Sequence, residues 1–339
     1  MIVTPQKAQK KFPKAKSLKQ IPVSLADMKC LVTGGAGFIG SHLCERLLKD
    51  GHDVLCIDNL GSGSLKNIEH LRKNKRFRFK KHDVIKRLDL KNAKIDWIFH
   101  LASRASPIDY QEYPVETALA NSVGTDRMAK LALAKNAKIL FSSTSEAYGE
   151  PKEHPQKESY FGNVNPVGIR SCYDESKRFG EALLMAYHRK HRLDVKIVRI
   201  FNTYGPRMRI DDGRVIPNFI TQCLKNKPIT IYGNGSQTRS FCYVDDLVDG
   251  IVKMMKSKEI GPKNLGNPKE LTVLEAAKLI KKLTNSKSEF IFKELPVDDP
   301  TRRQPDISRA REFLSWEPRV EFEEGLGKTI AWFKEQIER

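Results

Sequence analysis

Short apolar runs alternate with longer amphipathic segments over the first two thirds of this 339-residue chain. The apolar runs have the length of buried β-strands. Apolar strands that alternate with helices are typical of an α/β fold with a doubly wound parallel sheet. The predicted strands occupy residues 29–33, 53–58, 77–83, 95–101, 138–142 and 195–201, and a helix is predicted after each, the first at 41–49.

The pattern changes beyond about residue 205, where the apolar runs become shorter and proline and glycine interrupt them. We therefore predict a large domain at 28–205 and a smaller C-terminal α/β substrate lobe at 206–339. An amphipathic helix predicted at 243–255 is expected to return to the large domain. Residues 1–27 contain six lysines before the first acid, Asp27, and are predicted to form a basic extension.

The chain is strongly basic, with 60 Lys and Arg against 41 Asp and Glu and a net charge of +19. A nucleic-acid-binding protein would gather such an excess on a recognition surface. Here the basic residues are spread along the whole chain, without a recognition helix or an aromatic stacking motif. We therefore expect a basic solvated surface and no nucleic-acid partner.

No apolar stretch approaches the ~20 residues of a membrane-spanning helix. The N-terminus also lacks the apolar segment of a signal peptide, so we expect a cytoplasmic protein without membrane association. The cysteines are scattered, with no C-x-x-C pair and no histidine-rich cluster, which predicts reduced thiols and no metal. They are Cys30, Cys44, Cys56, Cys172, Cys223 and Cys242.

A glycine-rich turn follows the first predicted strand. Gly34, Gly37 and Gly40 recur every third residue, with Phe38 and Ile39 between the last two. Glycines allow backbone N–H groups to approach a pyrophosphate, whose charge is favoured at the N-terminus of the following helix. The spacing differs from the general G-x-G-x-x-G fingerprint, but the strand before it and the helix after it predict a Rossmann dinucleotide site.

Acidic residues end the second and third predicted strands. Asp58 is positioned to bind the hydroxyls of an adenosine ribose, and a carboxylate there disfavours a 2′-phosphate. Asn59 follows it without an adjacent arginine, so NAD is predicted in preference to NADP. Asp83 is predicted either to lie near the adenine or to cap a helix.

Tyr173 and Lys177 lie four residues apart in SCYDESKR, on one face of a predicted helix. A free phenol titrates at about 10, and the neighbouring ammonium and a positively charged nicotinamide are expected to lower its pKa. The pair by itself also fits an ordinary exposed helix. Together with the glycine turn it predicts a nicotinamide-dependent redox enzyme in which Tyr173 removes the proton of an alcohol.

These features occur in the order found in the extended short-chain dehydrogenase/reductase family, which the chain resembles from about Met28 to its C-terminus. The segments HLAS at 100–103 and TSE at 144–146 contribute to the resemblance. It implies that Leu101, Ala102 and Ser103 contact NAD together with the glycine turn.

Longer blocks resemble the UDP-glucuronate decarboxylases within that family, among them SSTSEAYGEP, RIFNTYGPRMRIDDGRVIPNF and DDPTRRQPDI. The resemblance implies a UDP-sugar substrate and an NAD that is reduced and reoxidised in one turnover. It implies catalytic roles for Thr144, Glu146, Tyr173, Lys177 and Arg303. It also implies a UDP site lined by Asn202, Tyr232, Gln237 and Arg239, although Tyr232 fits packing in an edge strand equally well.

The implied reaction begins with oxidation of the sugar at C4, which places the substrate carboxyl β to a ketone so that CO2 can leave. Thr144 would bind the C4 oxygen, while Glu146 and Arg303 would order the carboxyl and manage the C5 proton. The nearest alternative is a UDP-sugar 4-epimerase, which shares the oxidation. A 4,6-dehydratase and a cofactor-sensing binding protein are further alternatives.

Two positions depart from the decarboxylase pattern. Relatives tend to carry a lysine near Leu119 and a proline in place of Arg104. We therefore hypothesise that Arg104 anchors the substrate carboxylate; the alternative is a substrate without a carboxylate. The resemblance further implies a homodimer that pairs through helices at 115–135 and 173–191.

Overall fold

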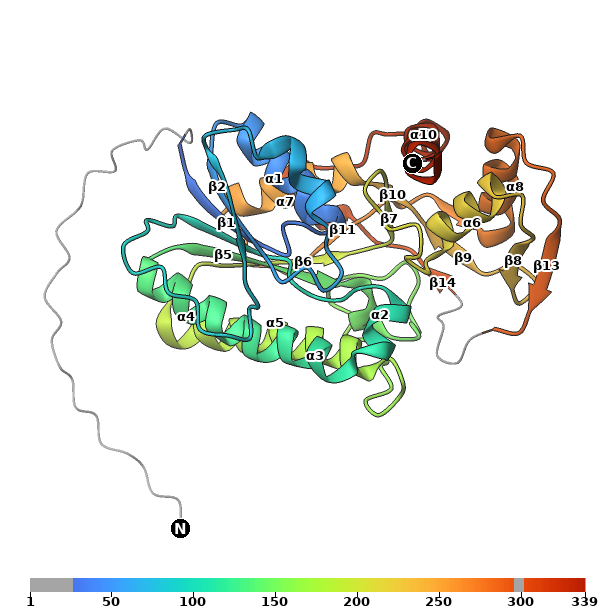
Figure 1. The fold of residues 1–339 in the computed structure, drawn as a ribbon. Helices are drawn as coiled ribbons and strands as arrows, with labels where there is room; N and C mark the ends of the chain where they lie inside the picture. Colours follow the sequence, from blue (N-terminus) through green and yellow to red (C-terminus); the bar gives the residue numbers. More distant parts are fainter. Residues whose placement is uncertain (1–26, 296–301, 339) are drawn as a thin grey trace, which may run out of the picture.

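A parallel sheet of seven strands forms the centre of the fold in the computed structural model, which describes residues 27–295 and 302–338 (Figure 1). The strands are β1 (Lys29–Thr33), β2 (Asp53–Asp58), β3 (Phe77–Lys81), β4 (Trp97–His100), β5 (Lys138–Thr144), β6 (Val195–Ile200) and β11 (Lys263–Leu265). Their spatial order is β11-β6-β5-β4-β1-β2-β3. This arrangement confirms the predicted doubly wound α/β fold. The predicted basic extension lies, except for Asp27, outside the described residues.

Helices cover both faces of the sheet (Figure 1). One face carries α1 (Phe38–Lys49) and α7 (Val244–Lys256), which pack against each other. The opposite face carries α3 (Pro114–Leu119), a π-helical turn η2 (Ala120–Gly124), α4 (Thr125–Lys135) and α5 (Ser171–His191).

Successive side chains of the strands enter the two apolar layers in turn. Cys30 and Val32 of β1 belong to the core that includes α1, whereas Leu31 between them belongs to the core that includes α4 and α5. This alternation follows from the period of two in a β-strand. Burial on both faces explains why the strands read as nearly continuous apolar runs.

Two connections differ from the prediction of a helix after every strand. The segment after β2 forms a 3-10 helix, η1 (Leu65–Leu71), and the described chain between β3 and β4 contains only turns. There the Asp83 carboxylate accepts a hydrogen bond from the backbone N–H of Ile85 at 3.0 Å. Such local bonds compete with helix formation. The alternative that Asp83 caps a helix is therefore wrong.

The helix predicted at 115–135 is interrupted by η2. Within this turn the Asn121 side chain donates a hydrogen bond to the Ser176 hydroxyl of α5 at 3.0 Å. The Asn121 carbonyl accepts a second bond from the Thr125 hydroxyl at 2.6 Å. The π-helical turn thus ties α3 and α4 to the helix that carries Tyr173, and such turns often lie near functional sites.

The C-terminal segments lie at one end of the sheet, where α6 (Val215–Leu224) packs on α8 (Val273–Thr284) (Figure 1). Two small sheets accompany them: β8 (Ile229–Tyr232) with β13 (Phe290–Lys293), and β9 (Thr238–Ser240) between β12 (Glu270–Thr272) and β14 (Arg302–Arg303). However, two elements of this half of the chain belong to the central layers: β11 pairs with β6 in the sheet, and α7 packs against it. The remaining elements are α2 (Pro107–Glu112), η3 (Ser145–Tyr148), β7 (Thr203–Tyr204), β10 (Cys242–Tyr243), α9 (Ser308–Leu314) and α10 (Phe322–Glu338).

Within residues 27–295 and 302–338, no helix combines the length and apolar character that crossing a bilayer requires. All six cysteines are free thiols.

Candidate active site

The carboxyl ends of the central strands open into a cavity of about 940 Å³. Ligands of parallel α/β sheets bind at this edge. Every residue that the sequence predicted for a site lines this cavity, although the chain brings them from both halves. These residues are Gly34, Gly37, Phe38, Ile39, Gly40, Asp58, Asn59, Asp83, Leu101, Ala102, Ser103, Arg104, Thr144, Glu146, Tyr173, Lys177, Asn202, Tyr232, Gln237, Arg239 and Arg303.

The glycine turn leaves the N-terminus of α1 open to an anion. Gly37 precedes α1 without a side-chain cap, and the first turn of the helix contains no acidic residue. Gly34 has a φ of +69°, and a Cβ there would lie 2.9 Å from the backbone of Ala102. The unpaired backbone N–H groups of the first turn therefore face the cavity as donors, which fits a pyrophosphate.

Asp58 supports this turn from the end of β2. Its carboxylate accepts hydrogen bonds from the backbone N–H groups of Ala36 at 3.0 Å and Leu60 at 2.8 Å. Burial raises the pKa of Asp58, and these two bonds oppose the increase. Beside it, the Asn59 side chain donates to Asp83 at 3.0 Å. The predicted ribose and adenine residues thus form one continuous wall.

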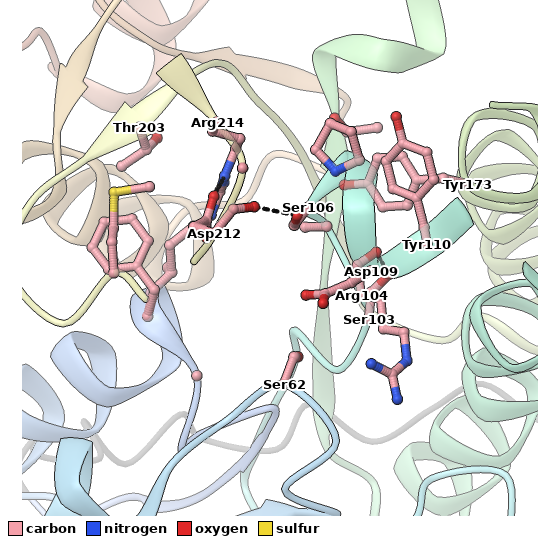
Figure 2. Close-up of a pocket in the computed structure, with 18 of the residues that line it drawn as sticks. Ser62, Ser103, Arg104, Ser106, Asp109, Tyr110, Tyr173, Thr203, Asp212 and Arg214 are labelled. Atoms are coloured by element: carbon pink, nitrogen blue, oxygen red, sulfur yellow. Dashed lines mark hydrogen bonds and ion pairs between the residues drawn. The ribbon is translucent and has the colours of Figure 1, made fainter. Parts of the chain in front are cut away.

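Tyr173 and Lys177 lie in the first turns of α5, on the face directed at the sheet. The Lys177 ammonium donates to the carbonyl of Ser142 at 2.7 Å and lies 5.7 Å from the centre of the Tyr173 ring. Thr144, the last residue of β5, lies close enough to the Tyr173 hydroxyl to oppose the effect of burial on its pKa. The Tyr173 ring stacks on Tyr110 with centres 5.1 Å apart and planes at 4° (Figure 2).

The predicted lowering of the Tyr173 pKa is wrong for the chain by itself. Burial raises this pKa, and the neighbouring Thr144 side chain offsets only part of the increase. Burial also lowers the pKa of Lys177 to about 7, against the attraction of Glu181. Desolvation disfavours the charged form of each group. A further positive charge near Tyr173 is therefore needed to make it a base at neutral pH.

Glu146 lies between two guanidinium groups. Arg170 donates to its carboxylate at 2.7 Å and Arg303 donates to the same oxygen at 3.2 Å. Burial alone would raise the pKa of Glu146, but Arg303 and then Arg170 lower it to about 2. Glu146 is therefore ionised at neutral pH and accepts hydrogen bonds instead of donating a proton.

Arg303 is held firmly, although an Arg-Arg pair between prolines is typical of a solvent-exposed loop. Its side chain is 1% exposed, and a second N–H donates to the carbonyl of Ser145 at 2.8 Å. The neighbouring Arg302 is exposed. Only one arginine of the pair therefore reaches the cavity.

The far wall of the cavity comes from the C-terminal half. Tyr232 ends β8 with a ring that is 42% exposed, so it does not pack into the core. The Gln237 side chain donates to the carbonyl of Tyr232 at 2.6 Å, and the buried Arg239 donates to the carbonyl of Thr238 at 2.9 Å. Asn202 follows β6, where its carbonyl accepts a bond from the backbone of Cys242 at 2.9 Å.

Arg104 lies elsewhere on the cavity wall. Its guanidinium is 4.0 Å from the centre of the Tyr113 ring and donates to the carbonyl of Gly61 at 3.3 Å. Figure 2 shows it on the side of Ser62, pointing away from Tyr173. This position does not support the hypothesis that Arg104 anchors a carboxylate at the reacting sugar.

Comparison with known proteins assigns the chain to a family. The model of the NAD dependent epimerase/dehydratase family matches residues 30–266. The chain belongs to this family. The match confirms the resemblance to extended short-chain dehydrogenases/reductases, and with it the predicted dependence on NAD.

Several members of the family are close to this chain. UDP-glucuronic acid decarboxylase 1 of Arabidopsis thaliana is 49% identical over 320 residues, which cover 94% of this chain and 73% of the relative. UDP-glucuronic acid decarboxylase 1 of Danio rerio is 48% identical over 97% of this chain and 77% of its own. The structure of UDP-glucuronic acid 4-epimerase from Bacillus cereus with UDP-glucuronic acid and NAD has a TM-score of 0.83 at 31% identity, covering 91% of this chain and 100% of the epimerase.

The sequence analysis missed three residues around this family's tyrosine. Arg170 precedes α5 and pairs with Glu146, Tyr110 stacks on Tyr173, and Asp174 is a buried carboxyl next to Tyr173. The sequence offered one signal for Arg170, namely its position directly before SCYDESKR. No spacing in the sequence relates Tyr110 to Tyr173, because α2 and α5 meet only in the tertiary structure.

Asp174 gives a prediction for the dependence of stability on pH. One of its oxygens has no hydrogen-bond partner among the described residues, and burial, then Glu146, raises its pKa to about 8. The folded protein thus binds a proton more tightly than the unfolded chain. The associated stability is present below about pH 4 and is lost as pH rises to about 8.

Asp174→Asn is therefore expected to stabilise the protein increasingly from pH 4 to pH 8. The gain at pH 8 should reach about 1–3 kcal/mol, the cost of an unsatisfied buried polar group. Urea unfolding across this range measures it. Glu175→Gln, at a half-exposed neighbouring position, is the control and should show no such trend. A difference between Asp174→Asn and the parent protein that stays constant with pH would contradict the expectation.

Proposed function

We propose that this chain converts UDP-glucuronate to UDP-xylose and CO2 through a 4-keto intermediate, with NAD recycled in each turnover. The observation that carries the proposal is that the Tyr173 and Lys177 pair and the Glu146 and Arg303 pair line a single cavity with the phosphate turn. The first pair suits oxidation of an alcohol. In the second pair, the guanidinium of Arg303 provides a positive charge that can bind the carboxylate of the sugar. The identity to the plant and animal decarboxylases supports the same conclusion.

The cavity wall fits NAD. The N-terminus of α1 would hold the pyrophosphate, Asp58 the adenosine ribose, and Leu101 to Ser103 the opposite side of the dinucleotide. When bound, NAD supplies a positively charged ring beside Tyr173 and accepts, then returns, the C4 hydride. That charge lowers the pKa of Tyr173 against the effect of burial.

The first step assigned to the chain is deprotonation of the C4 hydroxyl. Tyr173 takes the proton of the C4 hydroxyl as the C4–H bond breaks and a ketone forms. Thr144 is fixed for this step, since its hydroxyl oxygen accepts the N–H of Glu146 at 3.2 Å, and it lies beside the Tyr173 hydroxyl. Its O–H can therefore stabilise negative charge on the C4 oxygen.

Loss of CO2 follows from the ketone. The bond between C5 and the carboxyl breaks, and its electron pair moves into an enolate whose oxygen is bonded by Tyr173 and Thr144. Arg303 would orient the leaving carboxylate. Because Glu146 stays ionised, we assign to it the binding of the water that delivers a solvent proton to C5. Tyr173 finally returns its proton to the C4 oxygen, so that the net reaction consumes one proton.

The proposal assigns recognition of UDP to the second half of the chain. Residues 28–205 would bind NAD, and residues 206–339 would supply Tyr232 for stacking on uracil and Arg239 for the diphosphate. The exposure of the Tyr232 ring at the cavity supports this assignment.

The test is turnover of UDP-glucuronate labelled at the carboxyl carbon, with and without added NAD. The expected products are labelled CO2 and UDP-xylose in equal amounts, with no net accumulation of NADH. A 4-epimerase would instead form UDP-galacturonate and retain the label. That result would replace the proposed activity by its nearest alternative.

We also propose a homodimer through α3 and α5. Exposed apolar side chains along these helices support it, including Val115, Leu119 and Phe179, of which Phe179 is 51% exposed on α5. Phe179→Glu is expected to convert the dimer to a monomer in analytical ultracentrifugation. Phe313→Glu, at an exposed position on α9, should leave the dimer intact. A parent protein that sediments as a monomer at micromolar concentration contradicts the proposal.

A cytoplasmic location is proposed as well. The six free thiols support it, because disulfides are rare in the cytoplasm. Fractionation of cells that express the full chain tests it, and recovery from a secretory or extracellular fraction would refute it.

A further inference from the structure

Arg104 connects the ends of two strands across the mouth of the cavity. It follows β4, and its guanidinium donates to Gly61 in the loop after β2. In the sheet, β1 lies between β4 and β2. The glycine turn follows β1, so a side chain that reaches from the β4 end to the β2 loop crosses the region in front of that turn.

The loop that receives Arg104 is tied to the glycine turn. The backbone N–H of Ser64 and the side chain of Asn67 both donate to the carbonyl of Ala36 at 3.0 Å. Asp58 accepts the N–H of Ala36 at 3.0 Å from the same side. Arg104 is therefore held at a defined position relative to the N-terminus of α1.

Gly61 leaves room for the guanidinium on this loop. A Cβ added to Gly61 would lie 2.9 Å from Nη2 of Arg104, closer than side chains normally approach. On its other side the guanidinium lies over the Tyr113 ring at 4.0 Å. The contact with the aromatic face therefore orients the guanidinium before an anion binds.

The positive charge of Arg104 has no ion-pair partner within residues 27–295 and 302–338. The nearby Asp109 carboxylate is engaged elsewhere, because it accepts two bonds from Arg209, at 2.8 and 3.0 Å. A guanidinium has five N–H donors, and one of them reaches Gly61. The others can bind phosphate oxygens in a bidentate manner.

We propose that Arg104 binds the diphosphate of the dinucleotide from the side opposite α1 and thereby retains the cofactor in the cavity. This inference rests on the proposed function in so far as the dinucleotide is NAD. It replaces the hypothesis that Arg104 anchors the substrate carboxylate. A nucleotide sugar also contains a diphosphate, so the experiment measures the two nucleotides separately.

The test uses the full-length protein and two ligands, NAD and UDP, each titrated alone by calorimetry. Arg104→Leu is expected to weaken NAD binding about 10- to 100-fold, as expected for loss of a charge-assisted contact. UDP binding should stay unchanged, and less NAD should remain in the purified protein. Arg104→Lys should lie between Arg104→Leu and the parent protein. Arg72→Leu, which removes a positive charge from an exposed position just after η1, should match the parent protein.

A second variant keeps the arginine and displaces it. Gly61→Ala introduces the Cβ that meets the guanidinium, and it is expected to weaken NAD binding less than Arg104→Leu does. Unchanged NAD affinity in Arg104→Leu would overturn the proposal. An equal loss for UDP, or a raised KM for UDP-glucuronate with normal NAD binding, would also overturn it. A parent protein that binds NAD but releases no CO2 would refute the proposed function and leave this inference standing.

Discussion

Replacing Tyr173 by phenylalanine is expected to lower kcat for UDP-glucuronate by a factor of about 10²–10⁴, the usual contribution of a general acid–base group. The ring can keep its stack on Tyr110, so the fold should be preserved. What is lost is the group that accepts the C4 proton. Single-turnover absorbance at 340 nm should show no transient reduction of NAD, because the reaction stops before the ketone forms.

The control for this variant is another tyrosine of α5. Tyr187 lies outside the cavity and donates to Asp126 at 2.6 Å. Tyr187→Phe should lose a little stability and retain full turnover. If Tyr173→Phe released CO2 at the parent rate, the phenol would not be the base and the proposed chemistry would be incorrect.

Replacing Arg303 by methionine is expected to lower CO2 release by a factor of 10² or more, comparable to loss of a preorganised electrostatic contact. Arg303 is nearly fully buried and donates to both Glu146 and Ser145. Its removal also leaves the partly buried Glu146 with Arg170 as its partner, so the loss of stability should stay below the about 3–5 kcal/mol of an uncompensated buried charge. Labelled CO2 and urea unfolding measure the two effects.

The adjacent Arg302 offers a matched control, because it is exposed and does not line the cavity. Arg302→Met should keep both activity and stability. Arg303→Lys keeps a positive charge in a smaller donor and separates folding from chemistry if the methionine variant unfolds. A folded Arg303→Lys or Arg303→Met protein with parent CO2 release would refute the catalytic role.

Local sequence patterns were sufficient for the parts of the site that depend on local geometry. The glycine turn follows from conformations within Gly34 to Gly40, and the pairing of Tyr173 with Lys177 follows from the helical repeat. The apolar runs predicted the central sheet correctly, because its strands are short and buried on both faces. The helix predicted between β3 and β4 was wrong because the Asp83 side chain satisfies the backbone locally.

Contacts between distant segments were decided only by the tertiary structure. The tertiary structure stacks Tyr110 on Tyr173, pairs both Arg170 and Arg303 with Glu146, and brings Arg104 to Gly61. The same holds for the pKa of Tyr173, which depends on how much solvent the folded chain removes. The sequence by itself determined the fold and the residue types of the site, because these follow from local spacing, and the resemblance of its longer motifs indicated the family. Orientation, charge neutralisation and desolvation depend on packing in three dimensions, and only the structure could decide them.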